Sequence, residues 1–193
     1  MLLTIFRILN LVLLGNGLYK SLSTKLPPHL VKSGHFQFLT NCSLLTTLIY
    51  LFFATFGFQP NWLYNLSSNL EFNVIFSYWT MALVFPKMVA EGEVDRDLFM
   101  DLQVHAFPYL YLIIDSQPSL SIMKSWVLTC LYVFIYWVYF ESECGKHVPD
   151  GVSGYPYPFL KGKGMVERFG CMAIFAFIAC MNWFVLNLRN QLF

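Results

Sequence analysis

Long apolar segments alternate with short polar connections along the whole chain. A helix that crosses a hydrocarbon core about 30 Å thick needs roughly 17–25 mostly apolar residues, and six stretches of the sequence meet that length. This pattern predicts an all-α fold, a polytopic bundle of six transmembrane helices. The predicted spans are residues 2–19, 36–58, 72–90, 98–114, 122–140 and 166–188.

Helix-breaking residues mark the connections between these spans. Pro27-Pro28 and Gln117-Pro118 punctuate two of the loops, and the longest loop, between the fifth and sixth spans, is rich in glycine and proline. The sequence has no internal repeat and no low-complexity tract. We therefore expect residues 1–193 to form a single transmembrane domain.

Composition identifies the solvent that this bundle requires. Hydrophobic residues make up 57% of the chain and charged residues only 12%, with a mean hydropathy of +0.56. A soluble domain usually has about 45–50% apolar and about 25% charged residues, so this chain lacks the polar surface that water demands. We expect the lipid bilayer as its partner. The net charge of +1 gives no reason to expect nucleic acid as a partner.

The five cysteines neither form a disulfide framework nor show the spacing of metal ligands. Four of them lie in apolar segments, which is typical of reduced, buried thiols. Only Cys144 falls in a predicted loop. We expect no cofactor and no resident metal, and the sequence leaves the oligomeric state open.

Basic residues are distributed unevenly between the two ends of the predicted bundle. Nine of the twelve lie at the first, third and fifth loops, which predicts a cytoplasmic position for these loops by the positive-inside rule. Arg7 lies inside the first span and no small-x-small cleavage site follows it, so we expect a retained helix rather than a signal peptide. An endomembrane location such as the endoplasmic reticulum is expected. The nine residues are Lys20, Lys25, Lys32, Lys87, Arg96, Lys146, Lys161, Lys163 and Arg168.

The tripeptide Asn65-Leu66-Ser67 has the pattern of an N-glycosylation acceptor. It falls in the short connection predicted between the second and third spans. With the first loop in the cytoplasm, this connection faces the lumen, where such an acceptor is modified.

The fourth span is unusual because it contains Asp101, Gln103 and His105. An ionisable side chain at membrane depth costs roughly 2.5–3.5 kcal/mol on insertion scales, so it faces protein or water and is a functional candidate. Asp101 and His105 are four residues apart, which places them on one face of a helix. The carboxylate would then orient the imidazole as a general base. A helix-packing hydrogen bond without chemistry explains the pair equally well.

Thr40 lies near the start of the second span. A threonine in a membrane helix usually bonds its own backbone or packs against a neighbour, and composition favours that interpretation. At 1.5 Å per residue, however, Thr40 lies roughly 6 Å and His105 roughly 10 Å into their helices, counted from the same side of the membrane. We therefore expect the two side chains to meet beneath one membrane face.

Several short motifs follow one another in order along nearly the whole chain. They are Phe38-Leu39-Thr40, Phe85-Pro86, His105 followed by an apolar run to Asp115, Trp137-Val138 and, before the sixth span, Tyr157-Pro158-Phe159-Leu160, which is the most specific. In order and spacing these motifs resemble the androgen-induced, androgen-dependent TFPI-regulating family of multi-pass membrane proteins.

This resemblance implies a threonine hydrolase that cleaves fatty acid esters of hydroxy fatty acids. On this chain the roles of nucleophile and histidine base map onto Thr40 and His105. The sequence departs from the family in extra loop residues, Glu141 to Tyr155, and in Tyr139, which stands where the family has a histidine. These departures leave the identity of the lipid ester substrate open.

The chemistry that the resemblance implies needs more than two residues. A threonine hydroxyl is a weak nucleophile until a base removes its proton, and we assign Asp101 as the third member that orients His105. Donors are also needed for the developing oxyanion. Asn41, Gln37 and Tyr109 are the candidates for that role.

Two other interpretations stay open. Acidic residues before the fourth span, together with Asp101 and His105, contain the ligand types of a divalent cation site, although a solvated loop explains them better. The second is a non-catalytic membrane protein, a small transporter or an assembly factor. Transporters usually show repeats and polar groups at the midplane, whereas the polar residues singled out here cluster near one face. The acidic residues are Glu91, Glu93, Asp95 and Asp97.

Overall fold

The computed structural model describes residues 2–85 and 97–192, and every regular element within them is a helix. Short 3-10 helices occupy the connections that follow α1 and α6. The α-helices are α1 (Leu2–Ser23), α2 (Leu39–Thr55), α3 (Asn61–Val84), α4 (Leu98–His105), α5 (Phe107–Ile114), α6 (Ile122–Gly145) and α7 (Met165–Leu192). The 3-10 helices are η1 (Pro28–Ser33), η2 (His35–Gln37), η4 (Val148–Asp150) and η5 (Pro158–Leu160).

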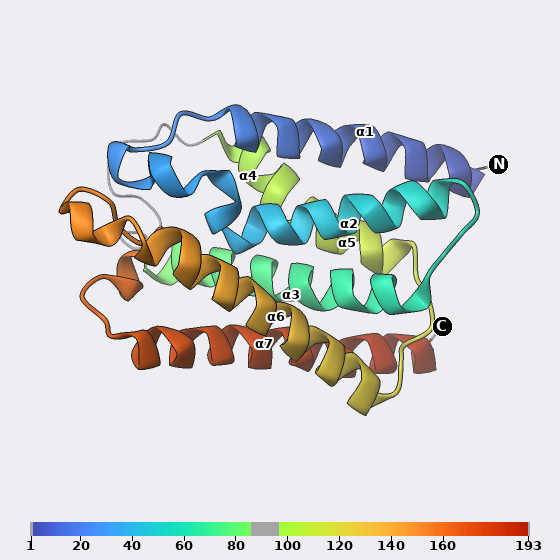
Figure 1. Cartoon of the computed structure of the whole chain (residues 1–193). Helices are drawn as coiled ribbons and strands as arrows, with labels where there is room; N and C mark the ends of the chain where they lie inside the picture. The colour runs from blue at the N-terminus through green and yellow to red at the C-terminus, as the bar shows by residue number, and fades with distance from the viewer. Residues whose placement is uncertain (1, 86–96, 193) are drawn as a thin grey trace.

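The helices run back and forth along one long axis, and the two chain termini lie at the same end of the bundle (Figure 1). The connections after α1 and α6 lie at the opposite end (Figure 1). α3 is the central helix, because it contacts α2, α5, α6 and α7. This arrangement leaves the outer helices to face the surroundings of the bundle.

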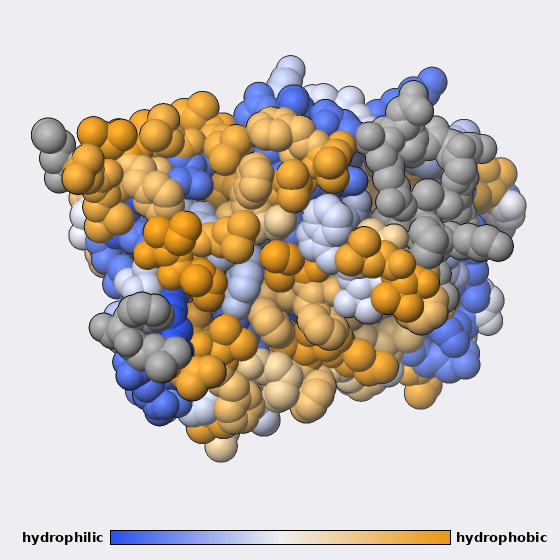
Figure 2. All heavy atoms as spheres, turned by 180° about the vertical axis from the view of Figure 1, so that it is seen from behind, coloured by the Kyte–Doolittle hydropathy of each residue, from blue (hydrophilic) through white to orange (hydrophobic). Residues whose placement is uncertain are grey.

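The outer surface is apolar, as the composition predicts. Large hydrophobic side chains are exposed on every long helix, and Figure 2 shows them over most of one long side of the bundle. In water this surface would be costly, whereas lipid solvates it. The protein is therefore an integral membrane protein.

Three helical segments in the described residues are long and apolar enough to cross a membrane: Leu2–Ser23, Ile122–Asp150 and Met165–Gln191. They correspond to the first, fifth and sixth predicted spans, and each extends beyond its predicted end. α2 is apolar but shorter. The described residues therefore contain three helices that are long and apolar enough to span a membrane. Six transmembrane helices, and the cytoplasmic position of the first, third and fifth loops, remain predictions.

The third predicted span, residues 72–90, begins too late. α3 starts at Asn61, and the polar residues assigned to a connection form its first half. Asn65, Asn69 and Asn73 recur every four residues and are buried against neighbouring helices. The glycosylation acceptor at Asn65 is therefore wrong, since its side chain bonds Pro118 and Leu120 inside the bundle. The predicted end of this span lies outside the described residues.

The second predicted span starts too early, and the fourth is interrupted by a break. Residue Phe38 is extended and α2 begins at Leu39, three residues later than predicted. The predicted helix 98–114 is broken at Ala106 into α4 and α5. Pro108 explains the break, because its ring has no N–H and collides with the preceding turn. His105 consequently ends α4.

A buried ion pair joins three helices near the termini. Arg7 of α1 is 5% exposed, and its Nε and Nη2 donate to the two carboxylate oxygens of Asp115 over 2.9 Å and 2.7 Å. Its Nη1 donates to the Ala54 carbonyl oxygen at the end of α2 over 2.9 Å. The Tyr111 hydroxyl of α5 donates to the same carboxylate. The charge of Arg7 is therefore neutralised within the bundle.

Candidate active site

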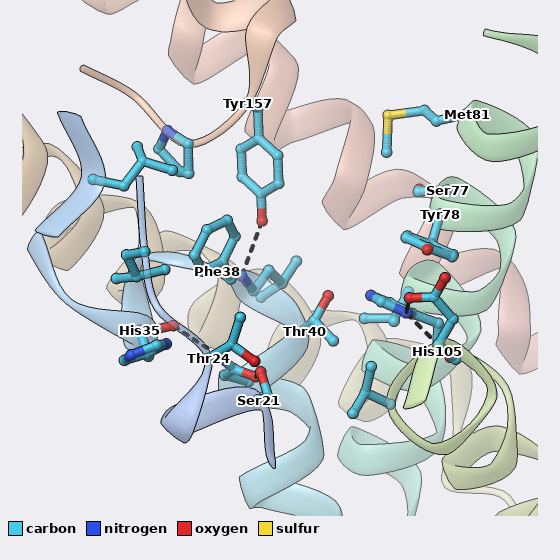
Figure 3. A pocket seen from close by; sticks show the side chains of 18 of the residues that line it. Ser21, Thr24, His35, Phe38, Thr40, Ser77, Tyr78, Met81, His105 and Tyr157 are labelled. Atoms are coloured by element: carbon cyan, nitrogen blue, oxygen red, sulfur yellow. Dashed lines mark hydrogen bonds and ion pairs between the residues drawn. The ribbon is translucent and has the colours of Figure 1, made fainter. Parts of the chain in front are cut away.

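A cavity of about 630 Å³ opens at the end of the bundle opposite the termini. The ends of α1, α2, α3 and α4 and the segment 156–161 line it. Thr40, Asp101 and His105 all lie on its wall. The structure thus brings together the three side chains that the sequence singled out from two distant segments (Figure 3).

Thr40 lies in the first turn of α2, where the chain has just entered the helix. Threonines farther along this helix, Thr46 and Thr55, donate to the carbonyl oxygen four residues earlier over 2.8 Å. The residue four positions before Thr40 is Phe36, which belongs to η2 rather than to α2 and whose carbonyl oxygen accepts from the Cys42 thiol over 3.3 Å. Among the described residues, none forms a hydrogen bond with the Thr40 hydroxyl, so this hydroxyl is available to a ligand.

The Tyr157 hydroxyl holds the start of α2 in place. It accepts a hydrogen bond from the Leu39 N–H over 3.0 Å and so satisfies one of the amide groups that a helix leaves unpaired at its first turn. Burial raises the pKa of Tyr157 to about 12, so the phenol stays neutral at physiological pH. Tyr157 thereby positions the turn that carries Thr40, which gives the Tyr157-Pro158-Phe159-Leu160 motif a structural role.

The imidazole of His105 is held in one orientation by two contacts. Its Nδ1 lies 3.2 Å from the backbone carbonyl oxygen of Asp101, one turn earlier in α4. A carbonyl oxygen only accepts hydrogen bonds, so Nδ1 donates, and in the neutral imidazole Nε2 then carries the lone pair of a base. The Tyr78 ring of α3 stacks on the imidazole with 3.5 Å between centroids and 2° between planes.

The side-chain carboxylate of Asp101 lies farther from the His105 imidazole than the backbone carbonyl oxygen of Asp101 does. Asp101 Oδ1 lies 3.8 Å from Nδ1 of His105, beyond hydrogen-bond distance. The sequence predicts that the Asp101 carboxylate makes the orienting contact, whereas in the structure the Asp101 backbone carbonyl oxygen is the atom within hydrogen-bond distance of Nδ1. The α4 N-terminus is capped separately by Asp97, whose carboxylate accepts from the Phe99 and Met100 N–H groups.

Thr40 and His105 face one another from opposite walls of the cavity (Figure 3). In the described part of the chain no hydrogen bond joins them directly, so the proposed proton transfer requires the two side chains to approach when a substrate is bound. Polar and apolar side chains both line the cavity, Lys25 and Lys161 among the first, Val74 and Phe175 among the second.

The three side chains predicted as oxyanion donors have other partners. Gln37 is fully buried and donates to the Leu30 and Gly34 carbonyl oxygens. Tyr109 donates to Asn182 over 2.7 Å. Asn41 lines the cavity, but its amide donates to the His35 carbonyl and accepts from Ser21, so its polar atoms stabilise the α1–α2 connection.

The alternative cation site receives no support from the described residues. Glu91, Glu93 and Asp95 lie outside them, as do Lys87 and Pro86. Elsewhere in the described chain, no group of three or more histidine, cysteine or acidic residues is arranged to hold a metal ion.

Residues of α3 form the part of the cavity that the sequence did not indicate. Asn73, Ser77 and Tyr78 line it, and Ser77 donates to Asn73 over 3.1 Å. The signal that identifies this helix is the asparagine at every fourth position from Asn61 to Asn73. A hydropathy pattern cannot detect this repeat of asparagines, because hydropathy counts every polar residue as unfavourable for a membrane span.

Comparison with known proteins agrees with a membrane bundle. The family described as FAR-17a/AIG1-like protein matches residues 2–191, nearly the whole chain. The chain is also similar to the UPF0641 membrane protein YHR140W of Saccharomyces cerevisiae, at 27% identity over 200 residues that cover 86% of this chain and 80% of the yeast protein. No solved structure matches the sequence.

Proposed function

Since the chain is a membrane protein that belongs to the FAR-17a/AIG1-like family, we propose that it hydrolyses lipid esters, with Thr40 as the nucleophile and His105 as the general base. The observation that carries this proposal is the pairing of two groups on the wall of one cavity. One is a hydroxyl that has no hydrogen-bond partner among the described residues, and the other is an imidazole whose Nδ1 is directed to a backbone carbonyl oxygen, which leaves Nε2 as the nitrogen that can act as a base. A threonine that only packs would bond its own helix, as Thr46 and Thr55 do.

The reaction follows from this arrangement. His105 Nε2 takes the proton of the Thr40 hydroxyl while the hydroxyl oxygen attacks the ester carbonyl carbon. The ester C–O bond then breaks, and the imidazolium returns the proton to the departing alcohol. Water, deprotonated by the same imidazole, next attacks the acyl-threonine. The bond between the acyl carbon and the Thr40 oxygen breaks, the imidazolium returns its proton to that oxygen, and the carboxylic acid is released. Tyr78 and the Asp101 carbonyl keep the imidazole plane fixed throughout.

A lipid ester fits the position and lining of the cavity. The cavity lies at an end of a bundle with an apolar outer surface, so an ester entering from the bilayer meets Thr40 near the headgroup level, where water is available. Its volume falls within the range of about 300–1,000 Å³ that is usual for small-molecule sites. The motifs shared with the androgen-induced branch of the family support fatty acid esters of hydroxy fatty acids as the substrate class.

Fluorophosphonate labelling of the purified protein tests the proposal. We expect the Thr40 oxygen to bond to phosphorus with loss of fluoride, because His105 activates the hydroxyl. Mass spectrometry of the digested protein should find the adduct on Thr40. Labelling should vanish in Thr40→Ala and persist in Thr40→Ser, which keeps a hydroxyl.

The matched control is Thr55→Ala, which removes a threonine of the same helix that bonds only its own backbone. We expect labelling in this variant to equal that of wild type. Labelling that survives in a folded Thr40→Ala variant, or no labelling of folded wild type, would rule out Thr40 as the nucleophile and favour a non-catalytic membrane protein.

Asp101 is proposed as a positioning residue that acts through its backbone carbonyl. We therefore expect Asp101→Asn, which keeps the backbone, to reduce ester hydrolysis much less than the about 10²-fold that the loss of a general base causes. The measurement is the rate of hydrolysis of a chromogenic fatty acyl ester in detergent. A loss as large as that caused by replacing His105 would instead assign the orienting role to the carboxylate.

A further inference from the structure

A second ionisable group lies deep in the bundle, away from Thr40 and His105. Glu71 is near the middle of α3 and is only 1% exposed. It does not line the cavity. Ionisable residues inside a membrane bundle are costly and are usually retained for a function. Glu71 therefore requires a separate explanation.

Two hydroxyl groups of α2 lie beside the Glu71 carboxyl group. The Thr47 hydroxyl of α2 donates to Glu71 Oε1 over 2.9 Å. The fully buried Ser43 hydroxyl lies near the same carboxyl group, yet no partner satisfies it with good hydrogen-bond geometry. A protonated carboxyl has one O–H to donate. The Ser43 oxygen is an acceptor at hand for that proton.

Among the described residues, no positive charge compensates Glu71. In the part of the chain that the structure describes, no lysine, arginine or histidine nitrogen lies within 4.0 Å of its carboxylate oxygens. The titratable group that faces it is Tyr132 of α6. Asp115, the other buried acid among the described residues, differs from Glu71 because it accepts two hydrogen bonds from Arg7. Burial without a countercharge disfavours the ionised form of a carboxyl group.

We propose that Glu71 is a proton-binding site inside the helix bundle, a carboxylic acid that holds its proton at neutral pH. On α2, Thr40, Ser43 and Thr47 are spaced three and four residues apart and share one face of the helix, and of the three only Thr40 lines the cavity. Hydroxyl groups thus extend from the acid toward the cavity. The site is independent of the proposed hydrolysis, since it uses neither Thr40 nor His105.

A lipid-soluble carbodiimide tests this assignment. N,N′-dicyclohexylcarbodiimide reacts with a protonated carboxyl group: the acid proton goes to a reagent nitrogen, the carboxyl oxygen bonds to the central carbon, and rearrangement gives a stable N-acylurea that retains the whole reagent. After incubation in phosphatidylcholine vesicles at neutral pH, mass spectrometry should find the adduct on Glu71. Asp115 in the same sample should remain unmodified, because both of its carboxylate oxygens are occupied by hydrogen bonds from Arg7.

Glu71→Gln should lose the adduct, while Thr40→Ala should keep it, so failure of this site and failure of the hydrolase are distinguishable. Infrared difference spectra of wild type minus Glu71→Gln provide a second readout that does not depend on access of the reagent. They should contain the carbonyl stretch of a protonated acid at neutral pH, and this band should convert to a carboxylate band at alkaline pH.

Two results would overturn the proposal. One is a carboxylate band from Glu71 at neutral pH. The other is loss of the adduct when sodium chloride replaces choline chloride at constant pH, because a metal cation held by Glu71, Thr47 and Ser43 would then compete with the proton.

Discussion

Replacement of His105 by glutamine is expected to lower the rate of ester hydrolysis by about 10²–10⁴-fold, the range for loss of a general base. The glutamine amide can occupy the same space beneath Tyr78, but it cannot take the proton of the Thr40 hydroxyl. The substitution should therefore reduce kcat more than it changes KM. Steady-state hydrolysis of a fatty acyl ester by the purified protein measures both constants.

His147→Gln is the matched control, because the same substitution is made in a loop beyond the cavity. We expect the control to retain the wild-type rate. His105→Gln should also lose fluorophosphonate labelling while Thr40 remains in place. A folded His105→Gln variant that hydrolyses esters at the wild-type rate would contradict the assignment of His105 as the base.

Replacement of Arg7 by methionine is expected to lower the free energy of unfolding by about 3–5 kcal/mol, the cost of leaving one partner of a buried ion pair uncompensated. Asp115 would then lie 3% exposed without the two hydrogen bonds that Arg7 donates. The Ala54 carbonyl oxygen would lose its donor as well. Denaturation of the protein in detergent, followed by circular dichroism, measures the change.

The double variant Arg7→Met, Asp115→Asn should recover part of this loss, because no charge is then left without a partner. Lys146→Ala is the control for an exposed ion pair. Lys146 lies 2.6 Å from Glu143 with more than half of its side chain exposed, so we expect a change below about 1 kcal/mol. Equal destabilisation by Arg7→Met and Lys146→Ala would show that the buried pair does not hold α1 to α2 and α5.

The helices that face lipid could be predicted from the sequence. α1, α6 and α7 are apolar over lengths that cross a bilayer, because their outer surfaces contact hydrocarbon and local composition must match it. The sequence did not predict the first half of α3. A central helix is solvated by its neighbours, so Asn69 is stabilised by Ser125 and Thr129 of α6, which are distant in sequence.

In the candidate site, too, some features could be predicted from the sequence and others could not. The sequence identified Thr40, Asp101 and His105 from residue type, spacing and family resemblance. It could not show that the Asp101 contact is made by a carbonyl, because Nδ1 selects its partner by geometry rather than by residue type. Nor could it find Tyr78, since ring stacking between α3 and α4 depends on how the two helices pack.

By itself, the sequence determined that this protein resides in a membrane, that it is all helical, and which side chains are candidates for chemistry. Composition and segment length suffice for these conclusions, because the bilayer acts on every residue that faces it. Only the tertiary structure decided which polar groups are satisfied. Arg7 pairs with Asp115 and Glu71 accepts a hydrogen bond from Thr47, whereas the Thr40 hydroxyl has no hydrogen-bond partner among the residues that the structure describes. Hydrogen bonding is short-ranged and directional, so its outcome depends on the packed positions of helices that the linear sequence does not contain.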